Sequence, residues 1–199
     1  EHIRWLETGL EKRLASCGRP CLLTDLAIMS ESGTLLDPDE PGEIVIRGSL
    51  VMAGYYKNPA ATKEISLHDW HHTGDIGVKD QDDYVYILDR KNDMIISGGF
   101  NIYPGEIEQV LWGLTEVQDC AVVGVPDDKW GEAVTAVIEL VPNMSLDEQS
   151  VISHCKAKLG SVKTPKAVLF WDTLPRSPVG KVLRRKVRDT FWENRDRAI

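Results

Sequence analysis

The amino-acid sequence predicts a mixed fold, in which a β-rich, barrel-like region is followed by a small α+β domain. Three observations lead to this prediction. Residues 18–88 contain short apolar runs separated by Gly, Pro, Asn and Asp, which is typical of strands and turns. After residue 90, segments of strand and helix character are interleaved. The chain has 199 residues, which suffices for one large domain or two small ones.

The elements of the first region follow from local signals. Ile and Leu recur at helical spacing over residues 3–14, and Gly18 with Pro20 breaks this helix. Asn58 and Pro59 cap a short helix over residues 60–65. The remaining apolar segments predict strands over residues 22–29, 34–36, 43–47, 70–73, 75–79 and 84–88. Residues 1–88 are therefore expected to form the end of a larger N-terminal domain.

The second region, residues 93–199, is expected to form a compact domain with helices on a small sheet. Pro104 opens a helix over residues 104–114, and the acids in its first turns suit the positive end of the helix dipole. Ser145 and Glu148 fit a capping box for a helix that Gly160 ends. Strands are predicted over residues 119–125, 134–141 and 166–171, and a last helix over residues 182–192. Residues 89–92 would link the two domains.

Composition excludes several classes of protein. The net charge of −8 is opposite to that of a general nucleic-acid binder. No apolar run reaches the length that crosses a bilayer, and no signal-peptide pattern opens the chain, so we expect a cytoplasmic protein or one loosely associated with a membrane surface. The four cysteines lack CxxC spacing, which favours reduced thiols over disulfides or a zinc site.

Three short motifs carry groups suited to chemistry. Asp75 follows a glycine between two predicted strands, where a carboxylate can accept both hydroxyls of a diol, although an Asp in a turn needs no ligand. Gly98 and Gly99 give either a tight reversal or a close approach to the backbone. Lys181 lies in a turn set by Pro178 and lacks the flanking residues of a phosphate loop. From residue 176 onward, eight Lys or Arg outnumber three acids, which indicates either phosphate binding or a solvated helix face.

Taken together, four motifs resemble the second half of the adenylate-forming enzymes, a family of acyl-CoA synthetases, luciferases and peptide-synthetase adenylation domains. The motifs are GEIVIRG from residue 42, TGD from residue 73, SGGFNIYPGEIE from residue 97 and PVGKVLR from residue 178. The third is most similar to the acyl-CoA ligase branch. The resemblance covers roughly residues 18–188. It implies that a carboxylic acid, with fatty acids as the expected class, reacts with ATP to give an acyl-adenylate, from which the acyl group passes to CoA.

The resemblance also implies a nucleotide site and a hinge. Asp75 and Arg90 would bind the ribose of ATP and of the adenylate, and Ile87 would lie near the adenine. Asn92 occupies the place of the family's hinge residue, which is commonly Lys or Asp. Asn tolerates unusual φ values, so a pivot is compatible with it, whereas a role for charge at the hinge is not.

For the two half-reactions, the resemblance implies further roles. Lys181 matches the catalytic lysine, which would contact the substrate carboxylate and the α-phosphate and neutralise the growing charge. Gly98 and Gly99 would line the channel for the pantetheine arm of CoA. Magnesium would accompany ATP, but no residue of the sequence is identified as its ligand.

The sequence begins with Glu1, and the family's phosphate loop, carboxylate pocket and acidic metal ligand do not occur in it. We therefore expect a fragment of a ligase that is inactive by itself. Two alternatives stay open: an adenylation module that loads a carrier protein, and a module that binds nucleotide without turnover. The acid substrate and the oligomeric state cannot be predicted from these residues.

Overall fold

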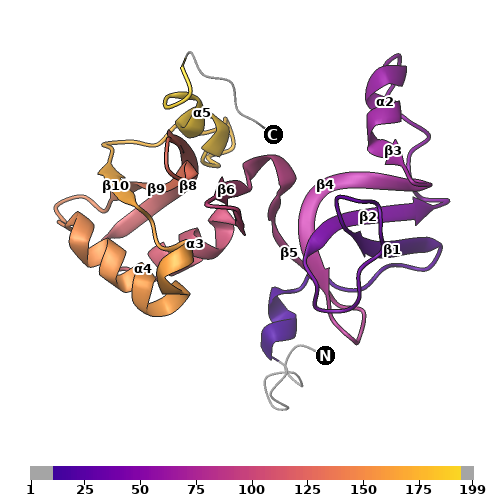
Figure 1. Ribbon diagram of the computed structural model, residues 1–199, viewed down its shortest axis with the longest axis horizontal. Coiled ribbons are helices and arrows are strands. Elements are labelled where there is room, and N and C mark those ends of the chain that lie inside the picture. Colours follow the sequence, from indigo (N-terminus) through magenta and orange to yellow (C-terminus); the bar gives the residue numbers. More distant parts are fainter. Residues whose placement is uncertain (1–10, 194–199) are drawn as a thin grey trace. The chain divides into compact units, whose positions relative to one another are not determined.

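The computed structural model describes residues 11–193 and divides the chain into two compact units, Glu1–Lys91 and Asn92–Ile199 (Figure 1). Each unit has its own sheet. The first is β-rich, and the second combines strands with helices. The predicted fold class is confirmed.

The first unit is built on an antiparallel five-stranded sheet that curls into a half-barrel (Figure 1). Strand β4 is central: β2 pairs with one edge of it, while β3 and β5 pair with different stretches of it. The elements of this unit are η1 (Glu11–Ala15), β1 (Thr24–Met29), β2 (Gly42–Gly48), α2 (Pro59–Ile65), β3 (Ser66–Leu67), β4 (Trp70–Lys79) and β5 (Val85–Arg90). The predicted N-terminal helix lies largely outside the described residues, and the predicted strand over residues 34–36 is a single bridge between Met29 and Leu35.

Helix α2 begins as the sequence predicts. The side-chain oxygen of Asn58 accepts a hydrogen bond from the amide of Ala61 at 3.1 Å, and Pro59 occupies the first helical position. The cap satisfies a backbone donor that would otherwise lack an intrahelical partner.

The second unit has three layers, with a five-stranded sheet between helices (Figure 1). Strand β9 is central; β8 runs antiparallel along it, while β10 pairs parallel with it and β6 meets it at Gly131. The elements are η2 (Lys91–Asp93), β6 (Ile95–Ser97), β7 (Phe100–Ile102), α3 (Pro104–Leu111), β8 (Val117–Asp127), β9 (Gly131–Leu140), α4 (Glu148–Lys163), β10 (Ala167–Phe170) and α5 (Arg184–Asp189).

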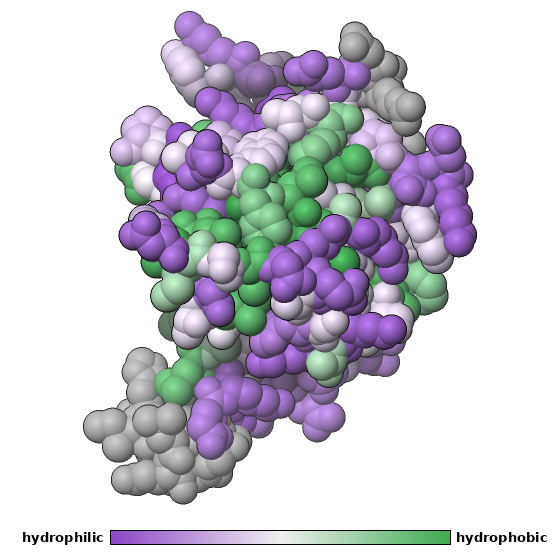
Figure 2. Space-filling model, turned by 90° about the vertical axis from the view of Figure 1, so that its left-hand side faces the viewer, coloured by the Kyte–Doolittle hydropathy of each residue, from purple (hydrophilic) through white to green (hydrophobic). Residues whose placement is uncertain are grey.

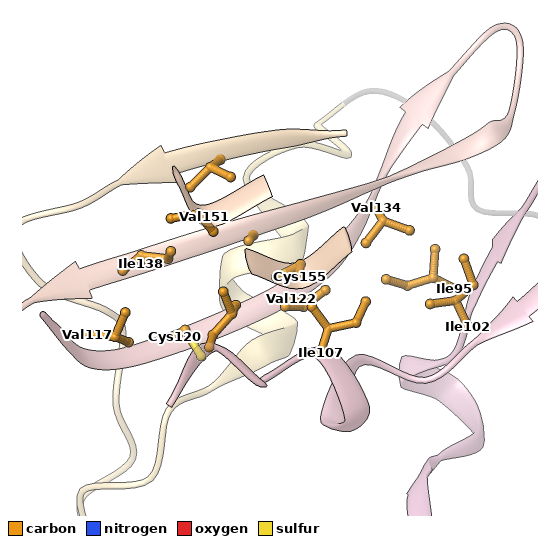
Figure 3. Close-up of a cluster of buried hydrophobic side chains, with 13 residues drawn as sticks. Ile95, Ile102, Ile107, Val117, Cys120, Val122, Val134, Ile138, Val151 and Cys155 are labelled. Atoms are coloured by element: carbon orange, nitrogen blue, oxygen red, sulfur yellow. The ribbon is translucent and has the colours of Figure 1, made fainter. Parts of the chain in front are cut away.

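Both faces of this sheet are covered, because alternate residues of β8 point to opposite sides. Cys120 and Val122 join the larger core, to which α3 contributes Ile107 and α4 contributes Val151 (Figure 3). The intervening residues of β8 pack with Val187 of α5 in a second core. Helix α5 is thereby fixed to the sheet, and so is the loop that precedes it.

The start of α4 differs from the prediction. Asp147, not Ser145, is the N-cap, and its carboxylate accepts a hydrogen bond from the amide of Ser150 at 3.0 Å. Asp is at least as good a cap as Ser, so the later of two competing caps is used. Gly160 interrupts the helix with a φ of 74°, after which a further turn reaches Lys163.

Polar and charged side chains cover much of the face in Figure 2, with apolar residues gathered near its middle. Within residues 11–193, no helix is both long and apolar enough to cross a membrane. All four cysteines are free thiols, and Cys120 and Cys155 are buried. Burial raises the pKa of Cys155 to about 11, so this thiol stays protonated at neutral pH.

Candidate functional site

The Thr73-Gly74-Asp75 segment lies within a single strand, β4, and not between two strands as predicted. The register between β2 and β4 shifts here: Glu43 pairs with Ile76 and Val45 with His72, so the segment bulges away from regular pairing. The Thr73 hydroxyl donates to the carbonyl of Ile44 at 2.7 Å. A bulge changes the direction in which the side chains of a strand point, and here it redirects the side chains of the Thr73-Gly74-Asp75 segment.

The bulge also requires its glycine. Gly74 has a φ of +74°, whereas a Cβ there would meet no atom within 4 Å. Backbone conformation, rather than lack of space, therefore demands glycine at this position. The amide of Gly74 donates to the carboxylate of Glu43 at 3.2 Å, which holds the bulge against β2.

Asp75, Arg90 and Ile87 share one face of the first unit. Asp75 is the cross-strand partner of Arg90, and the two form an ion pair of 2.7 Å from Arg90 Nε to the carboxylate. In a regular strand, Ile87 and Arg90 would point to opposite faces, because they are three residues apart. A register shift in β5 pairs Ile87 with Gly77, which lies two residues from Asp75 and hence on the same face.

This face presents charged and apolar side chains next to one another. The side chain of Arg90 is 70% exposed, and Ile87 is 54% exposed. A carboxylate, a guanidinium and an exposed aliphatic side chain offer hydrogen-bond acceptors, hydrogen-bond donors and an apolar contact close together. The structure brings together the three predicted nucleotide residues.

Gly98 and Gly99 form the turn of the β6–β7 hairpin, and glycine is needed there for two different reasons. Both have positive φ, +59° and +81°. A Cβ on Gly98 would lie 2.8 Å from the ring of Trp130, whereas one on Gly99 would meet nothing within 4 Å. Gly98 is required by packing inside the unit, and only Gly99 leaves space for a close approach from outside.

Lys181 lies at a hairpin turn that opens toward solvent. Ser177 shapes this turn: its amide donates to the carbonyl of Lys181 at 2.8 Å, and its hydroxyl accepts from the Lys181 amide at 3.1 Å. Gly180 completes the reversal with a φ of +83°. The backbone of Lys181 is thus held, while its side chain is exposed.

Arg176 anchors this hairpin to the sheet. Its guanidinium donates to Asp119 of β8 at 2.7 Å and to Glu139 of β9 at 2.9 Å, and these bonds raise the pKa of the guanidinium. It also reaches the carbonyl of Gly180 at 3.3 Å. The planar guanidinium of Arg176 therefore fixes the backbone position from which the Lys181 side chain extends.

Part of the basic C-terminal region is neutralised within the second unit. Arg184 binds Glu108 of α3 through two nitrogens, at 3.0 and 2.7 Å, and Asp93 of η2 at 2.9 Å. Glu108 is buried, and its carboxylate also accepts from the Val122 amide at 2.9 Å. Arg176 and Arg184 thus bind acids of their own unit, so these two guanidinium groups are not available as a phosphate-binding cluster. Arg195 and Arg197 lie outside the described residues.

Asn92 is exposed and is the first residue of the second unit. Asn92 thus lies where the chain divides into two units, and its role as a pivot stays a prediction. Among residues 11–193, no three His, Cys, Asp or Glu side chains are grouped so as to bind a metal.

Sequence reasoning missed Glu43. The sequence predicts a strand over residues 43–47, but no sequence signal distinguishes Glu43, and its role is apparent only from its partners in the folded chain. Glu43 is buried and accepts hydrogen bonds from His72 and Lys91, both at 2.9 Å. Burial by itself would raise the pKa of Glu43, but these hydrogen bonds outweigh it and lower the pKa below its ordinary value. Trp130, which packs on Gly98, was missed as well.

Comparison with known proteins gives two matches along the chain. Residues 4–56 match the family of AMP-binding enzymes, and residues 106–181 match the AMP-binding enzyme C-terminal domain. The second match ends at Lys181.

A medium/long-chain-fatty-acid–CoA ligase from Mycobacterium tuberculosis is 42% identical over 95% of this chain and 34% of its own length. ATP-bound MatB from Rhodopseudomonas palustris is similar in structure, with a TM-score of 0.83 and 36% identity, covering 89% of this chain and 36% of that one. So is o-succinylbenzoate CoA synthetase from Bacillus subtilis, in complex with its acyl-adenylate, with a TM-score of 0.83 and 36% identity over 92% of this chain and 37% of that one. The chain spans about a third of the length of the curated relatives that it matches.

Proposed function

The chain belongs to the family of AMP-binding, adenylate-forming enzymes, and from that premise we propose that the whole protein carrying it is an acid–CoA ligase. It joins a carboxylic acid to the thiol of CoA at the expense of ATP. The observation that carries the proposal is the gathering of Asp75, Arg90 and Ile87 on one face by the register shift in β5. Relatives named as fatty-acid–CoA ligases support a fatty acid as the substrate class.

In the first half-reaction, a carboxylate oxygen of the acid attacks the α-phosphorus of ATP, and the bond to the pyrophosphate oxygen breaks. Asp75 and Arg90 bind the ribose, and Ile87 contacts the adenine. Lys181 places its ammonium beside the attacking carboxylate and the α-phosphate, where negative charge grows. Positioning and charge neutralisation are the main contributions a protein makes to such a transfer. In the part of the chain that the structure describes, no three His, Cys, Asp or Glu side chains are grouped so as to bind a metal, and none of these residues is proposed as a magnesium ligand.

In the second half-reaction, the sulfur of CoA attacks the acyl carbon, AMP leaves, and the thiol proton passes to solvent. Gly99 supplies the space beside its backbone that the pantetheine arm needs, and Gly98 lets Trp130 pack beneath the turn. Lys181 and the glycine turn lie in one unit but serve different steps. The second unit therefore turns about Asn92 between the two half-reactions, as in other enzymes with domain closure.

The test is pyrophosphate release and CoA-thioester formation by the whole protein with ATP and a panel of fatty and aromatic acids. Asp75→Ala is compared with Asp25→Ala, because Asp25 also forms a cross-strand ion pair with an arginine of the same unit, Arg47, at 2.9 Å. We expect acid-dependent turnover, a weakened affinity for ATP in Asp75→Ala and unchanged kinetics in Asp25→Ala. Equal effects of the two substitutions, or no thioester with any acid, would contradict the proposal.

A further inference from the structure

Each of the two residues that join the units is bound by a side chain of its own unit. Lys91, the last residue of the first unit, extends its ammonium to the carboxylate of Glu43 at 2.9 Å. Glu43 is only 9% exposed and is itself fixed to β4, where it accepts from His72 Nδ1 and from the Gly74 amide. The carboxylate is therefore a firm anchor, because it is buried itself and moving it would break its hydrogen bonds to three half-buried donors.

On the other side, helix α5 holds the start of the second unit. Arg188 donates to the main-chain carbonyl of Asn92 at 3.0 Å, and its side chain is only 18% exposed. Arg184, one turn earlier in α5, donates to the carboxylate of Asp93 at 2.9 Å. Val187 lies between them in sequence and is fully buried against the sheet, so the helix that carries both arginines is fixed.

We propose that Glu43 and Arg188 are positioning residues that confine the turning of the units to the link between Lys91 and the carbonyl of Asn92. Peptide groups are planar, so the main-chain torsions left between the two anchored groups are ψ of Lys91 and φ and ψ of Asn92. Without the anchors, neighbouring residues of the short helix η2 would share the rotation, because a single 3₁₀ turn resists bending weakly. The inference rests on the proposed function only in assuming that the units turn.

The purpose of such confinement is to give a few defined orientations instead of a broad range. A rotation carried by few torsions has few allowed wells, because sterics forbid most of φ/ψ space. Two half-reactions that need different groups of one unit, Lys181 and the glycine turn, require two defined orientations. Glu43 also binds the Gly74 amide, so the same carboxylate fixes both the bulge that carries Asp75 and the residue before the pivot.

The experiment measures the distribution of distances between the units in the 199-residue chain by pulsed electron spin resonance. Spin labels are placed at Glu64→Cys in α2 and Lys156→Cys in α4, which are exposed helical positions. The two exposed native cysteines are first replaced by Ser (Cys17 and Cys21). We expect resolved distance peaks in this background, because the anchors allow few orientations.

Three substitutions remove the anchors, and two matched ones do not. They are Glu43→Gln, Lys91→Met and Arg188→Ala. Lys91→Met removes the ammonium but leaves the other hydrogen bonds of Glu43 intact, so it still tests the anchor if Glu43→Gln does not fold. The controls are Asp25→Asn, which breaks an exposed ion pair of the first unit, and Arg185→Ala, on the same helix as Arg188 but 82% exposed.

We expect the anchor variants to lose the resolved peaks to one broad distribution, while the controls keep them. Thermal unfolding monitored by circular dichroism confirms that each variant is folded. A background chain that is already broad, unchanged peaks in Lys91→Met and Arg188→Ala, or equal broadening in the controls would overturn the proposal. The measurement needs no substrate, so a failure of the ligase assay leaves this result standing, and the reverse also holds.

Discussion

Replacing Arg184 by Ala is expected to destabilise the second unit by about 3–5 kcal/mol, because it strands a buried carboxylate. Glu108 is only 4% exposed and accepts two hydrogen bonds from Arg184, at 3.0 and 2.7 Å. The Val122 amide also binds this carboxylate at 2.9 Å, but a single amide does not offset the desolvation of a full charge. Asp93 loses its 2.9 Å partner as well.

Urea unfolding monitored by circular dichroism measures this loss. Thermal unfolding gives a second readout: at about 4–8 °C per kcal/mol for a domain of this size, a loss of about 3 kcal/mol lowers the melting temperature by more than roughly 10 °C. Arg185→Ala is the matched control: Arg185 is 82% exposed and lies 3.7 Å from Asp189, so we expect a change within about 0.5 kcal/mol.

The double variant Arg184→Ala/Glu108→Gln separates the ion pair from other effects of Arg184. Gln keeps an oxygen for the Val122 amide and removes the unpaired charge, so the double variant should be more stable than Arg184→Ala alone. A loss below about 1 kcal/mol in Arg184→Ala, or a loss equal to that of Arg185→Ala, would refute the reasoning.

Three further predictions concern other parts of the chain. Gly98→Ala should lower stability more than Gly99→Ala, because both acquire the left-handed penalty of about 1–2 kcal/mol but only Gly98 meets the Trp130 ring at 2.8 Å; urea unfolding of the two variants checks this, and equal losses would contradict it. When the pH is lowered from about 6 to about 3, wild type should lose more stability than Glu43→Gln. The pKa of Glu43 in the folded chain lies below its ordinary value of 4.5, so this carboxylate stabilises the fold above pH 4.5, and the contribution is lost as the pH falls through the folded pKa. Parallel losses of stability in the two proteins would argue against this. At pH 8, a thiol reagent should label the exposed cysteines of the native chain and reach the two buried thiols (Cys120 and Cys155) only after unfolding, and rapid labelling of all four would contradict their burial.

Elements whose ends are marked by local chemistry could be predicted from the sequence. Asn58 caps α2, and Pro104 begins α3, because the signals lie within the elements themselves. Where two signals compete, the sequence does not decide between them: Asp147 caps α4 although Ser145 fits a capping box.

Features that depend on pairing between distant segments could not be predicted. The bulge at Thr73-Gly74-Asp75 arises from the register against β2, so the sequence pattern indicates a break where the strand continues. The shift in β5 likewise aligns Ile87 with Arg90, against simple alternation. Glu43 binds His72 of β4 and Arg176 binds Asp119 of β8, and these roles appear only when those strands are in place.

The central claim, that Lys181 acts while the carboxylate attacks phosphorus, is tested most directly by single-turnover rates in the whole protein. We expect Lys181→Ala to slow adenylate formation by roughly 10²–10³-fold, about 3–4 kcal/mol, as when one preorganised transition-state donor is removed. Lys181→Gln should behave alike, because the length is nearly kept and the charge is lost. Lys186→Ala, an exposed lysine of α5, serves as the control. Capture of a synthetic acyl-adenylate by CoA should be largely spared in Lys181→Ala, whereas an equal loss in both half-reactions, with the fold intact, would contradict the account.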